Sequence, residues 1–139
     1  MTAYVDASVL LRVALGQADA LTEWRRIERG VSSALIVVES LRTLDRLRLR
    51  ARLPDRDLAE RRQAALAIFG SLALGEIAAV VLDRAAQPMP TGLGTLDAIH
   101  LATALLWNEM TGRAAVMATH DAALATAAKA HGLEVIGFG

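Results

Sequence analysis

Four acidic residues stand directly beside apolar residues, in the segments YVDAS, IVVES, TLDAI and ATHDA. They are Asp6, Glu39, Asp97 and Asp121. Each could simply cap or begin a helix, because aspartate is a favoured N-cap and acids are favourable in a first helical turn. Their shared placement beside apolar residues favours a second interpretation, in which all four converge on one partly buried edge of the fold.

Carboxylates gathered at such an edge would repel one another, since like charges raise each other's pKa and burial adds to the cost. A divalent cation removes this repulsion, and oxygen-only ligands suit Mg²⁺ or Mn²⁺. Such an ion can polarise a phosphoryl oxygen, activate a water and stabilise a leaving oxygen. The residues therefore indicate metal-dependent hydrolysis of a phosphodiester. No Ser/His/Asp arrangement and no GxxxxGK[ST] phosphate loop is evident.

The elements that must position these acids alternate along the chain. Short apolar segments predict strands at residues 3–5, 33–38, 71–75, 114–118 and 133–138. Helices are expected at about 8–15, 18–29, 39–49, 57–69, 77–86, 96–110 and 122–130, with Gly30 ending the second helix and a loop at 87–94. Short apolar strands separated by helices imply a parallel sheet covered on both faces.

The acids fall where such a sheet binds its ligands. Asp6 and Glu39 each follow directly on a predicted strand, with Glu39 in the first turn of its helix, and Asp121 lies three residues past the fourth strand. Ligands of open parallel sheets bind outside the carboxyl ends of the strands. Asp97 joins this edge if its helix packs with its N-terminus there, which a right-handed crossover permits.

The composition predicts one folded domain spanning residues 1–139. Hydrophobic residues make up 54% of the chain, and 15 basic residues balance 15 acidic ones, so net charge says nothing about a polyanionic partner. The absence of cysteine excludes disulfides, thiolate metal sites and cysteine nucleophiles, and it fits a reducing compartment. With no signal peptide and no apolar run of about 18–20 residues, a cytoplasmic protein without a membrane span is expected.

Four segments together resemble PIN-domain ribonucleases, specifically VapC-type toxins of toxin–antitoxin pairs: YVDASVLL, VVESLRTLDRL, TLDAIHLATALL and MATHDAALATAA. The resemblance extends over essentially the whole chain, and the block LDAIHLATA is its most specific part. It implies a single-domain, three-layer α/β/α fold with a five-stranded parallel sheet. The family's four acids map onto Asp6, Glu39, Asp97 and Asp121, and its small hydroxyl residues onto Ser8 and Thr119.

The resemblance also implies roles. All four acids would be catalytic; Asp6, Asp97 and Asp121 would bind Mg²⁺ or Mn²⁺, whereas Glu39 could bind the metal through water or help to activate the nucleophilic water. Family members cleave RNA endonucleolytically, usually dimerise, and are silenced by a cognate VapB-type antitoxin whose tail enters the site. The two hydroxyl residues would orient carboxylates, although ordinary helix capping explains them equally well.

Eight arginines against four acids make residues 41–63 locally basic. Arg42, Arg46 and Arg50 recur every four residues and should line one helical face, where they could hold RNA phosphates or an acidic antitoxin segment. The simpler interpretation is a solvated face with local pairs such as Asp45 with Arg48. A positive mean hydropathy predicts that a partner covers one apolar surface.

Histidines and tryptophans receive mostly structural interpretations. His100 is expected to be a core histidine hydrogen-bonded to a carboxylate rather than a metal ligand, and His120 lies in the loop at the active edge, where it could contact substrate. His131, near the end of a helix, is expected to interact with the helix dipole. Trp24 and Trp107 fall in apolar helical patterns that predict core or dimer packing.

Other protein classes fit less well. A response-regulator receiver needs a pair of acids after its first strand, where Asp6 stands alone, and a lysine after a late strand, whereas Lys129 lies in the middle of a predicted helix. A HAD-type phosphatase needs DxD, and here Ser8 occupies the second position. The remaining alternative is a catalytically inactive PIN-like module that binds RNA or a protein.

Overall fold

A five-stranded parallel sheet forms the centre of the computed structural model, which describes residues 1–51 and 53–138. The strand order is β3-β2-β1-β4-β5. The strands are β1 (Thr2–Val5), β2 (Arg29–Ser33), β3 (Leu72–Gly75), β4 (Val116–Ala118) and β5 (Val135–Ile136). The helices are α1 (Ala7–Ala14), α2 (Leu35–Ala51), α3 (Asp55–Ser71), α4 (Ala79–Ala85), α5 (Thr95–Thr111) and α6 (Ala122–Ala130), with a short 3₁₀ turn η1 (Trp24–Arg26).

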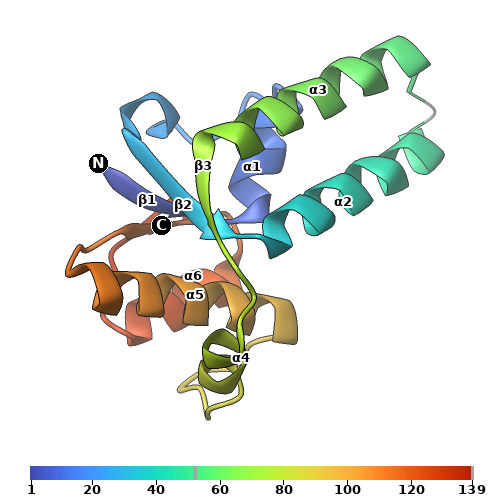
Figure 1. The fold of residues 1–139 in the computed structure, drawn as a ribbon. Coiled ribbons are helices and arrows are strands. Elements are labelled where there is room, and N and C mark those ends of the chain that lie inside the picture. Colours follow the sequence, from blue (N-terminus) through green and yellow to red (C-terminus); the bar gives the residue numbers. More distant parts are fainter. Residues whose placement is uncertain (52, 139) are drawn as a thin grey trace.

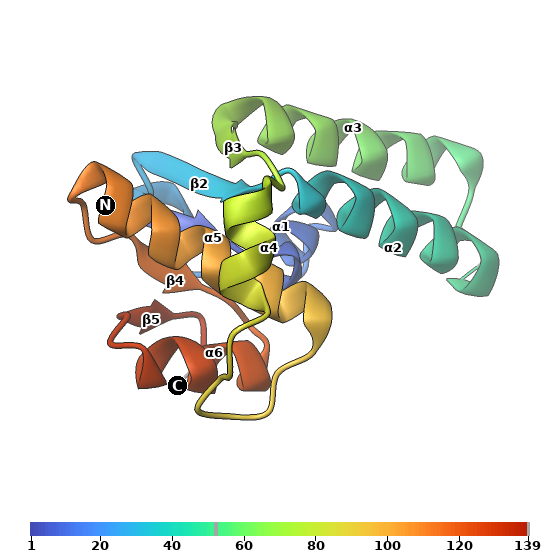
Figure 2. The same ribbon diagram turned by 60° about the horizontal axis from the view of Figure 1, so that its bottom comes forward.

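Helices cover both faces of this sheet, as the alternation along β1 illustrates. Ala3 and Val5 pack into a core with α1, α2 and α3, whereas Tyr4 between them packs into a second core with α5 and α6. The ribbons show α1, α2 and α3 on one side of the sheet and α5 and α6 on the other (Figure 1, Figure 2). The expected three-layer α/β/α architecture with a five-stranded parallel sheet is therefore confirmed.

The prediction of a strand over residues 33–38 is wrong. The second strand ends at Ser33, and α2 begins at Leu35. Ser33 Oγ accepts a hydrogen bond from the Leu35 main-chain N–H at 3.1 Å, which satisfies one of the free donors at the start of the helix. Ile36 is fully buried while Val38 is half exposed, the alternation of a helix with one face on the core. A short apolar run cannot by itself be assigned to strand or helix.

The predicted helix over residues 18–29 is also wrong. This segment contains only the 3₁₀ turn η1, and the chain then enters β2 at Arg29. The main-chain N–H groups of Glu28 and Arg29 both donate to the Met1 carbonyl, at 2.9 and 3.4 Å, which aligns the segment beside β1. Gly30 therefore lies inside a strand, where a Cβ would come within 2.5 Å of the Leu72 side chain. It does not end a helix.

The other elements occur where they are expected, with shifted ends. The third, fourth and fifth strands are shorter than predicted, and α3 and α5 are longer. Residues 87–94 form the predicted loop. Trp24 and Trp107 are partly buried against the two cores. Within the described residues, no helix is both long and apolar enough to span a membrane.

Candidate active site

Asp6 lies where β1 gives way to α1, and its carboxylate is held by three donors. It is only 4% exposed and serves as the N-cap of α1. Oδ1 accepts from the Ala7 main-chain N–H at 2.7 Å, and Oδ2 accepts from Ser8 Oγ at 2.7 Å and from Thr119 Oγ1 at 2.8 Å. The buried negative charge is thus fixed in one orientation by neutral donors.

Thr119 connects this carboxylate to the next acid along the edge. It is fully buried directly after β4, and its Oγ1 also accepts from the Asp121 main-chain N–H at 3.0 Å. Asp121 caps α6, with Oδ1 accepting from the Leu124 main-chain N–H at 2.9 Å. Ser8 and Thr119 therefore contact the Asp6 carboxylate directly, which is the geometry for orienting it, and Thr119 also supports the turn that carries Asp121.

Asp97 faces the other acids from the first turn of α5. Burial raises the pKa of its carboxyl to about 6, and the negative charges of Asp121, Asp6 and Glu39 contribute to the rise, while His100 opposes the shift. The charges of three other carboxylates therefore reach Asp97. Its neighbour Leu96 lines the same groove as Glu39 and as Ala7, the residue after Asp6. The N-terminus of α5 packs at that edge, as a right-handed crossover permits.

Glu39 reaches the site from the second turn of α2, because α2 begins earlier than the sequence indicates. Its Oε1 is hydrogen-bonded by His100 Nε2, and the other ring nitrogen, Nδ1, is bonded to the Tyr4 hydroxyl at 2.7 Å. In the neutral ring, Tyr4 donates to Nδ1 and Nε2–H donates to Glu39. His100 and Tyr4 are both buried, so a continuous hydrogen-bonded chain runs from the core to the site.

His100 is thus a core histidine bonded to a carboxylate, as expected, although its partner is Glu39 of α2. Burial lowers its pKa, but the hydrogen bond to Glu39 and the charges of Glu39, Asp6 and Asp97 more than offset this, so the pKa lies above its ordinary value. Burial raises the pKa of the Tyr4 phenol far above its usual range. Sequence reasoning missed Tyr4, whose only signal was its place in a buried strand before Asp6.

The donor chemistry of this site fits a hard divalent cation. All four acids offer oxygen ligands, and three of them raise the pKa of the fourth, Asp97, while His100 lowers it. Among residues 1–51 and 53–138, no three acidic or histidine side chains already form a group that could hold a metal ion. Excess negative charge is therefore present at the site, without a closed set of ligands.

Arginines flank the site only in part. Arg42 and Arg46 line a groove of about 310 Å³ beside Glu39, whereas Arg50 lies exposed further along α2. The groove is lined by Ala7, Leu35, Val38, Glu39, Arg42, Thr43, Arg46 and Leu96. The expected local pair between Asp45 and Arg48 is present at 3.3 Å. Of the three arginines predicted to line one helical face, two therefore lie at the groove and the third does not.

This fold, with acids gathered where the parallel strands end, defines a PIN domain. The sequence profile of the PIN domain matches residues 3–139, and the chain belongs to this family. Over 136 residues it is 35% identical to Ribonuclease VapC46 of Mycobacterium tuberculosis (strain ATCC 25618 / H37Rv), an alignment that covers 96% of this chain and 95% of the relative. The resemblance to VapC-type members is confirmed.

A solved structure shares the same fold. The crystal structure of PAE2754 from Pyrobaculum aerophilum aligns with 96% of this chain and 83% of its own, with a TM-score of 0.58 and 24% sequence identity. At this identity the match concerns the arrangement of strands and helices.

Proposed function

We propose that this protein is a Mg²⁺- or Mn²⁺-dependent endoribonuclease that hydrolyses RNA phosphodiester bonds in the cytoplasm, as the toxin of a toxin–antitoxin pair. The observation that carries the proposal is the gathering of acids at the carboxyl edge of the sheet. Thr119 links Asp6 to the turn that carries Asp121, and the charges of Asp6, Glu39 and Asp121 add to the burial that raises the pKa of Asp97. The 35% identity to a relative named as a ribonuclease supports the reaction class.

In this proposal Asp6, Asp97 and Asp121 hold the cation, which when bound polarises a phosphoryl oxygen and offsets the charge of the reacting phosphate. Ser8 and Thr119 keep the Asp6 carboxylate oriented toward the site. His100 occupies Glu39 Oε1, so Oε2 is the oxygen that would accept a proton from the attacking water. The carboxylates thus contribute by holding the cation, which would stabilise the developing negative charge, and by positioning the reacting groups.

The groove beside Glu39 is the proposed seat of the antitoxin tail. Leu35, Val38 and Leu96 offer apolar contact area, and Arg42 and Arg46 stand at the same groove. A segment that carries apolar and acidic side chains would complement both features. Its position next to Glu39 would let it block RNA from the catalytic carboxylates.

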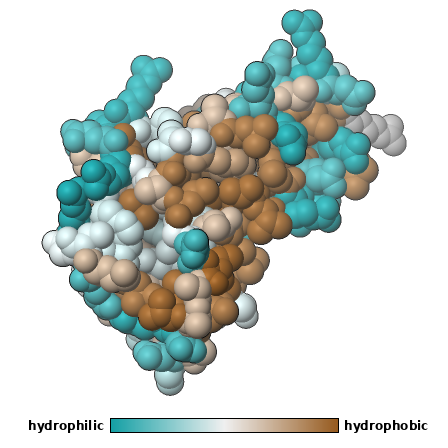
Figure 3. Space-filling view, viewed as in Figure 1, coloured by the Kyte–Doolittle hydropathy of each residue, from teal (hydrophilic) through white to brown (hydrophobic). Residues whose placement is uncertain are grey.

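A second copy of the chain would cover an apolar face formed by α2, β3 and α4. Val38, Leu74, Ile77 and Val80 are all substantially exposed there. Figure 3 shows hydrophobic residues gathered over β3 and the start of α2 on this side. β3 also stands at the end of the strand order, so its outer edge has no strand partner in the described part of the chain. This face is the proposed homodimer contact.

The decisive experiment measures RNA cleavage by purified protein freed of antitoxin. Single-stranded RNA should be cut with added Mg²⁺ or Mn²⁺ and remain intact with EDTA. Asp6→Asn should reduce cleavage by at least about 100-fold, since metal binding depends on the charge of its ligands, while Asp83→Asn, at an exposed position on α4, should behave as wild type. Cleavage by Asp6→Asn at the wild-type rate would contradict the proposal.

The toxin assignment needs its own readout. Expression of the protein alone should arrest bacterial growth, and co-expression of the cognate antitoxin should restore it. Expression of Asp6→Asn should leave growth normal. Growth arrest by Asp6→Asn would separate toxicity from the proposed nuclease.

An inactive PIN-like binding module is the second candidate, favoured by the lack of a ready three-ligand group among the described residues. Titration calorimetry with MnCl₂ distinguishes the two. If wild type binds Mn²⁺ at millimolar concentration and Asp97→Asn binds it more weakly, the enzyme is supported. If neither wild type nor Asp97→Asn gives any heat of binding, the inactive module is supported.

A further inference from the structure

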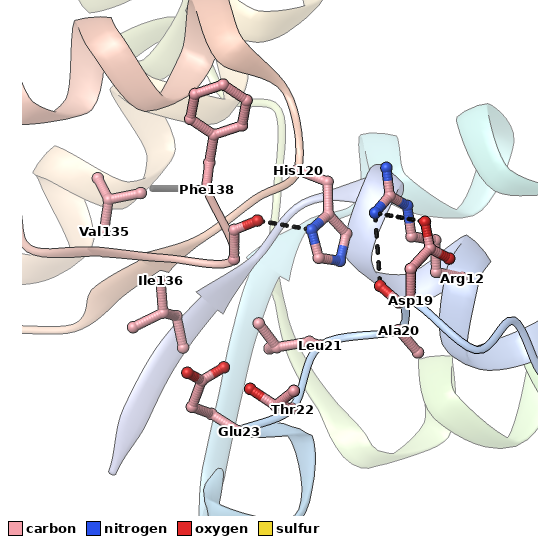
Figure 4. A pocket seen from close by; sticks show the side chains of 11 residues that line it. Arg12, Asp19, Ala20, Leu21, Thr22, Glu23, His120, Val135, Ile136 and Phe138 are labelled. Atoms are coloured by element: carbon pink, nitrogen blue, oxygen red, sulfur yellow. Dashed lines mark hydrogen bonds and ion pairs between the residues drawn. The ribbon is translucent and has the colours of Figure 1, made fainter.

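A second pocket, of about 440 Å³, lies at the carboxyl end of β5 on the α1 side of the sheet. In Figure 4, His120 stands between Phe138 and the Arg12–Asp19 pair, with Thr22 and Glu23 on the opposite side. The pocket is lined by Arg12, Asp19, Ala20, Leu21, Thr22, Glu23, His120, Val135, Ile136, Gly137 and Phe138. The residues come from α1, the following loop, the β4–α6 turn and the end of β5.

His120 joins this pocket to the catalytic carboxylates. It lies between Thr119, which holds Asp6, and Asp121, and its main-chain N–H donates to Ser8 Oγ at 2.9 Å. Its Nδ1 is 2.7 Å from the Gly137 carbonyl, which can only accept, so Nδ1 carries a proton. Nε2 is buried and has no hydrogen-bond partner among the described residues. A ligand N–H or O–H brought to Nε2 would satisfy it.

The charges of the pocket disfavour a phosphate. Arg12 is paired with Asp19, its Nη1 lying 3.1 Å from Oδ2, and Glu23 adds a second carboxylate. Among the described residues that line the pocket, the fixed charges therefore sum to one negative charge. A neutral ligand with hydrogen-bond donors suits this surface better than an anion.

The rim carries an aromatic ring in a position set by the backbone. Phe138 is 44% exposed and follows Gly137, whose φ is +91°. A Cβ at Gly137 would lie 2.7 Å from the Thr119 carbonyl, so the end of β5 packs tightly against the β4–α6 turn. Gly137 itself lies close to Leu21 and to His120 Nδ1, and Phe138 follows it at the rim of the pocket. Exposed aromatic rings of this kind are the usual platforms for unpaired bases.

We propose that this pocket binds the unpaired base of a nucleotide adjacent to the scissile phosphate. The inference rests on the proposed ribonuclease function and assigns a substrate subsite to it. Phe138 stacks on the base, His120 Nε2 accepts one hydrogen bond, and Glu23 accepts another from an exocyclic amino group. The pocket therefore favours an amino-bearing base over uracil at one position beside the cleavage site.

The test uses single-stranded RNA oligonucleotides with one cleavage site, in which each flanking base is replaced in turn by an abasic residue. Wild-type protein should lose about tenfold in kcat/KM at one such position. The kcat/KM of Phe138→Ala on the intact RNA should be about tenfold below that of wild type. Replacing the base at that position by an abasic residue should not lower the kcat/KM of this variant further. Phe138→Tyr should retain the wild-type pattern, because it keeps the ring.

A variant at His120 tests the second contact. His120→Asn can keep a donor for the Gly137 carbonyl and removes Nε2, so it should raise KM several-fold on RNA and weaken the preference against uracil at the same position. Phe138→Ala and His120→Asn should lose much less activity on bis(p-nitrophenyl) phosphate, a phosphodiester without bases, than on RNA. Equal losses on this substrate would overturn the subsite, because they would indicate a structural defect.

Two further outcomes would overturn the proposal. In the first, Phe138→Ala shows the same loss of kcat/KM on the abasic RNA as wild type. In the second, the variants at Phe138 and His120 lose antitoxin binding but cleave RNA as wild type does. If neither substrate is cut by any protein, the nuclease proposal fails. Fluorescence anisotropy with the same oligonucleotides then tests base binding separately. Wild type must bind the abasic RNA more weakly than the intact RNA, and Phe138→Ala must bind both equally.

Discussion

His100 holds Glu39 in place from inside the protein. Its two ring nitrogens are both engaged, Nδ1 by the Tyr4 hydroxyl and Nε2 by Glu39 Oε1. Removing the ring would leave two polar groups without partners, and one of them is deeply buried. The histidine therefore contributes to stability and, in the proposed mechanism, to the position of the oxygen that receives a proton.

Substitution of His100 should separate these contributions. His100→Leu should destabilise the protein by about 1–3 kcal/mol, the usual cost of unpaired buried groups, and lower kcat for RNA at least about tenfold. His100→Gln can still donate to Glu39 and should recover a large part of kcat. Urea denaturation and single-turnover cleavage provide the measurements. Equal kcat values for the two variants would contradict a positioning role.

Asp97 makes the metal-free protein sensitive to pH. Its folded pKa of about 6 lies above the ordinary 3.8, so its contribution to stability is fully present below about pH 4 and is lost as the pH rises through 6. In EDTA, the Tm of wild type relative to Asp97→Asn should therefore fall between about pH 4 and pH 6. Saturating Mn²⁺ should remove that fall. An unchanged Tm difference across this range would show that folding does not raise the pKa of Asp97.

At the scale of elements, Gly137 fixes the junction between β5 and the β4–α6 turn. Its φ is positive, and a Cβ added there would lie only 2.7 Å from the Thr119 carbonyl, which leaves little room for any side chain. Thr119 in turn holds Asp6 and supports Asp121. A disturbance at the end of the two shortest strands, β4 and β5, should therefore reach the Asp6 and Asp121 carboxylates.

Gly137→Ala should lower stability by about 1–3 kcal/mol, because alanine is strained at positive φ and its methyl group would press on Thr119. Its RNA cleavage should also fall. Gly92→Ala is the matched control, since nothing lies within 4 Å of the added Cβ and its φ is not in the positive range. Thermal unfolding of both variants provides the comparison. Equal Tm values would refute the proposed tight junction.

At the scale of the whole molecule, the apolar face of α2, β3 and α4 is the surface that we propose a second copy of the chain covers. Ile77 and Val80 are 40% and 56% exposed. Charged side chains at these positions should be tolerated in the monomer, because both already reach solvent. They should be costly wherever a second copy covers the face.

The double variant Ile77→Glu/Val80→Glu should therefore be monomeric where wild type is dimeric, as measured by sedimentation equilibrium. Met110→Glu is the control, because Met110 is 81% exposed on α5, which is not one of the elements that form this face. The control should remain dimeric. A dimer that persists in the double variant would place the contact on another surface.

The four candidate site acids and most of the helices could be predicted from the sequence alone. Asp6, Glu39, Asp97 and Asp121 are recognisable because each carboxylate stands against apolar residues, a costly placement that demands a compensating partner. The helices near 57–69, 96–110 and 122–130 follow from local information: apolar spacing, Asp121 as an N-cap, and Gly112 and Gly132 just after the helix ends. These signals act within a few residues of the chain.

Features that depend on distant partners could not be predicted from the sequence. The second strand lies at Arg29–Ser33 because it pairs with β1 and β3, while the apolar residues after it join α2, although they have the composition of a strand. His100 meets Tyr4 across 96 positions of sequence, and His120 meets Gly137 only when β5 pairs with β4. Strand pairing and burial are contacts between segments, so no local pattern encodes them.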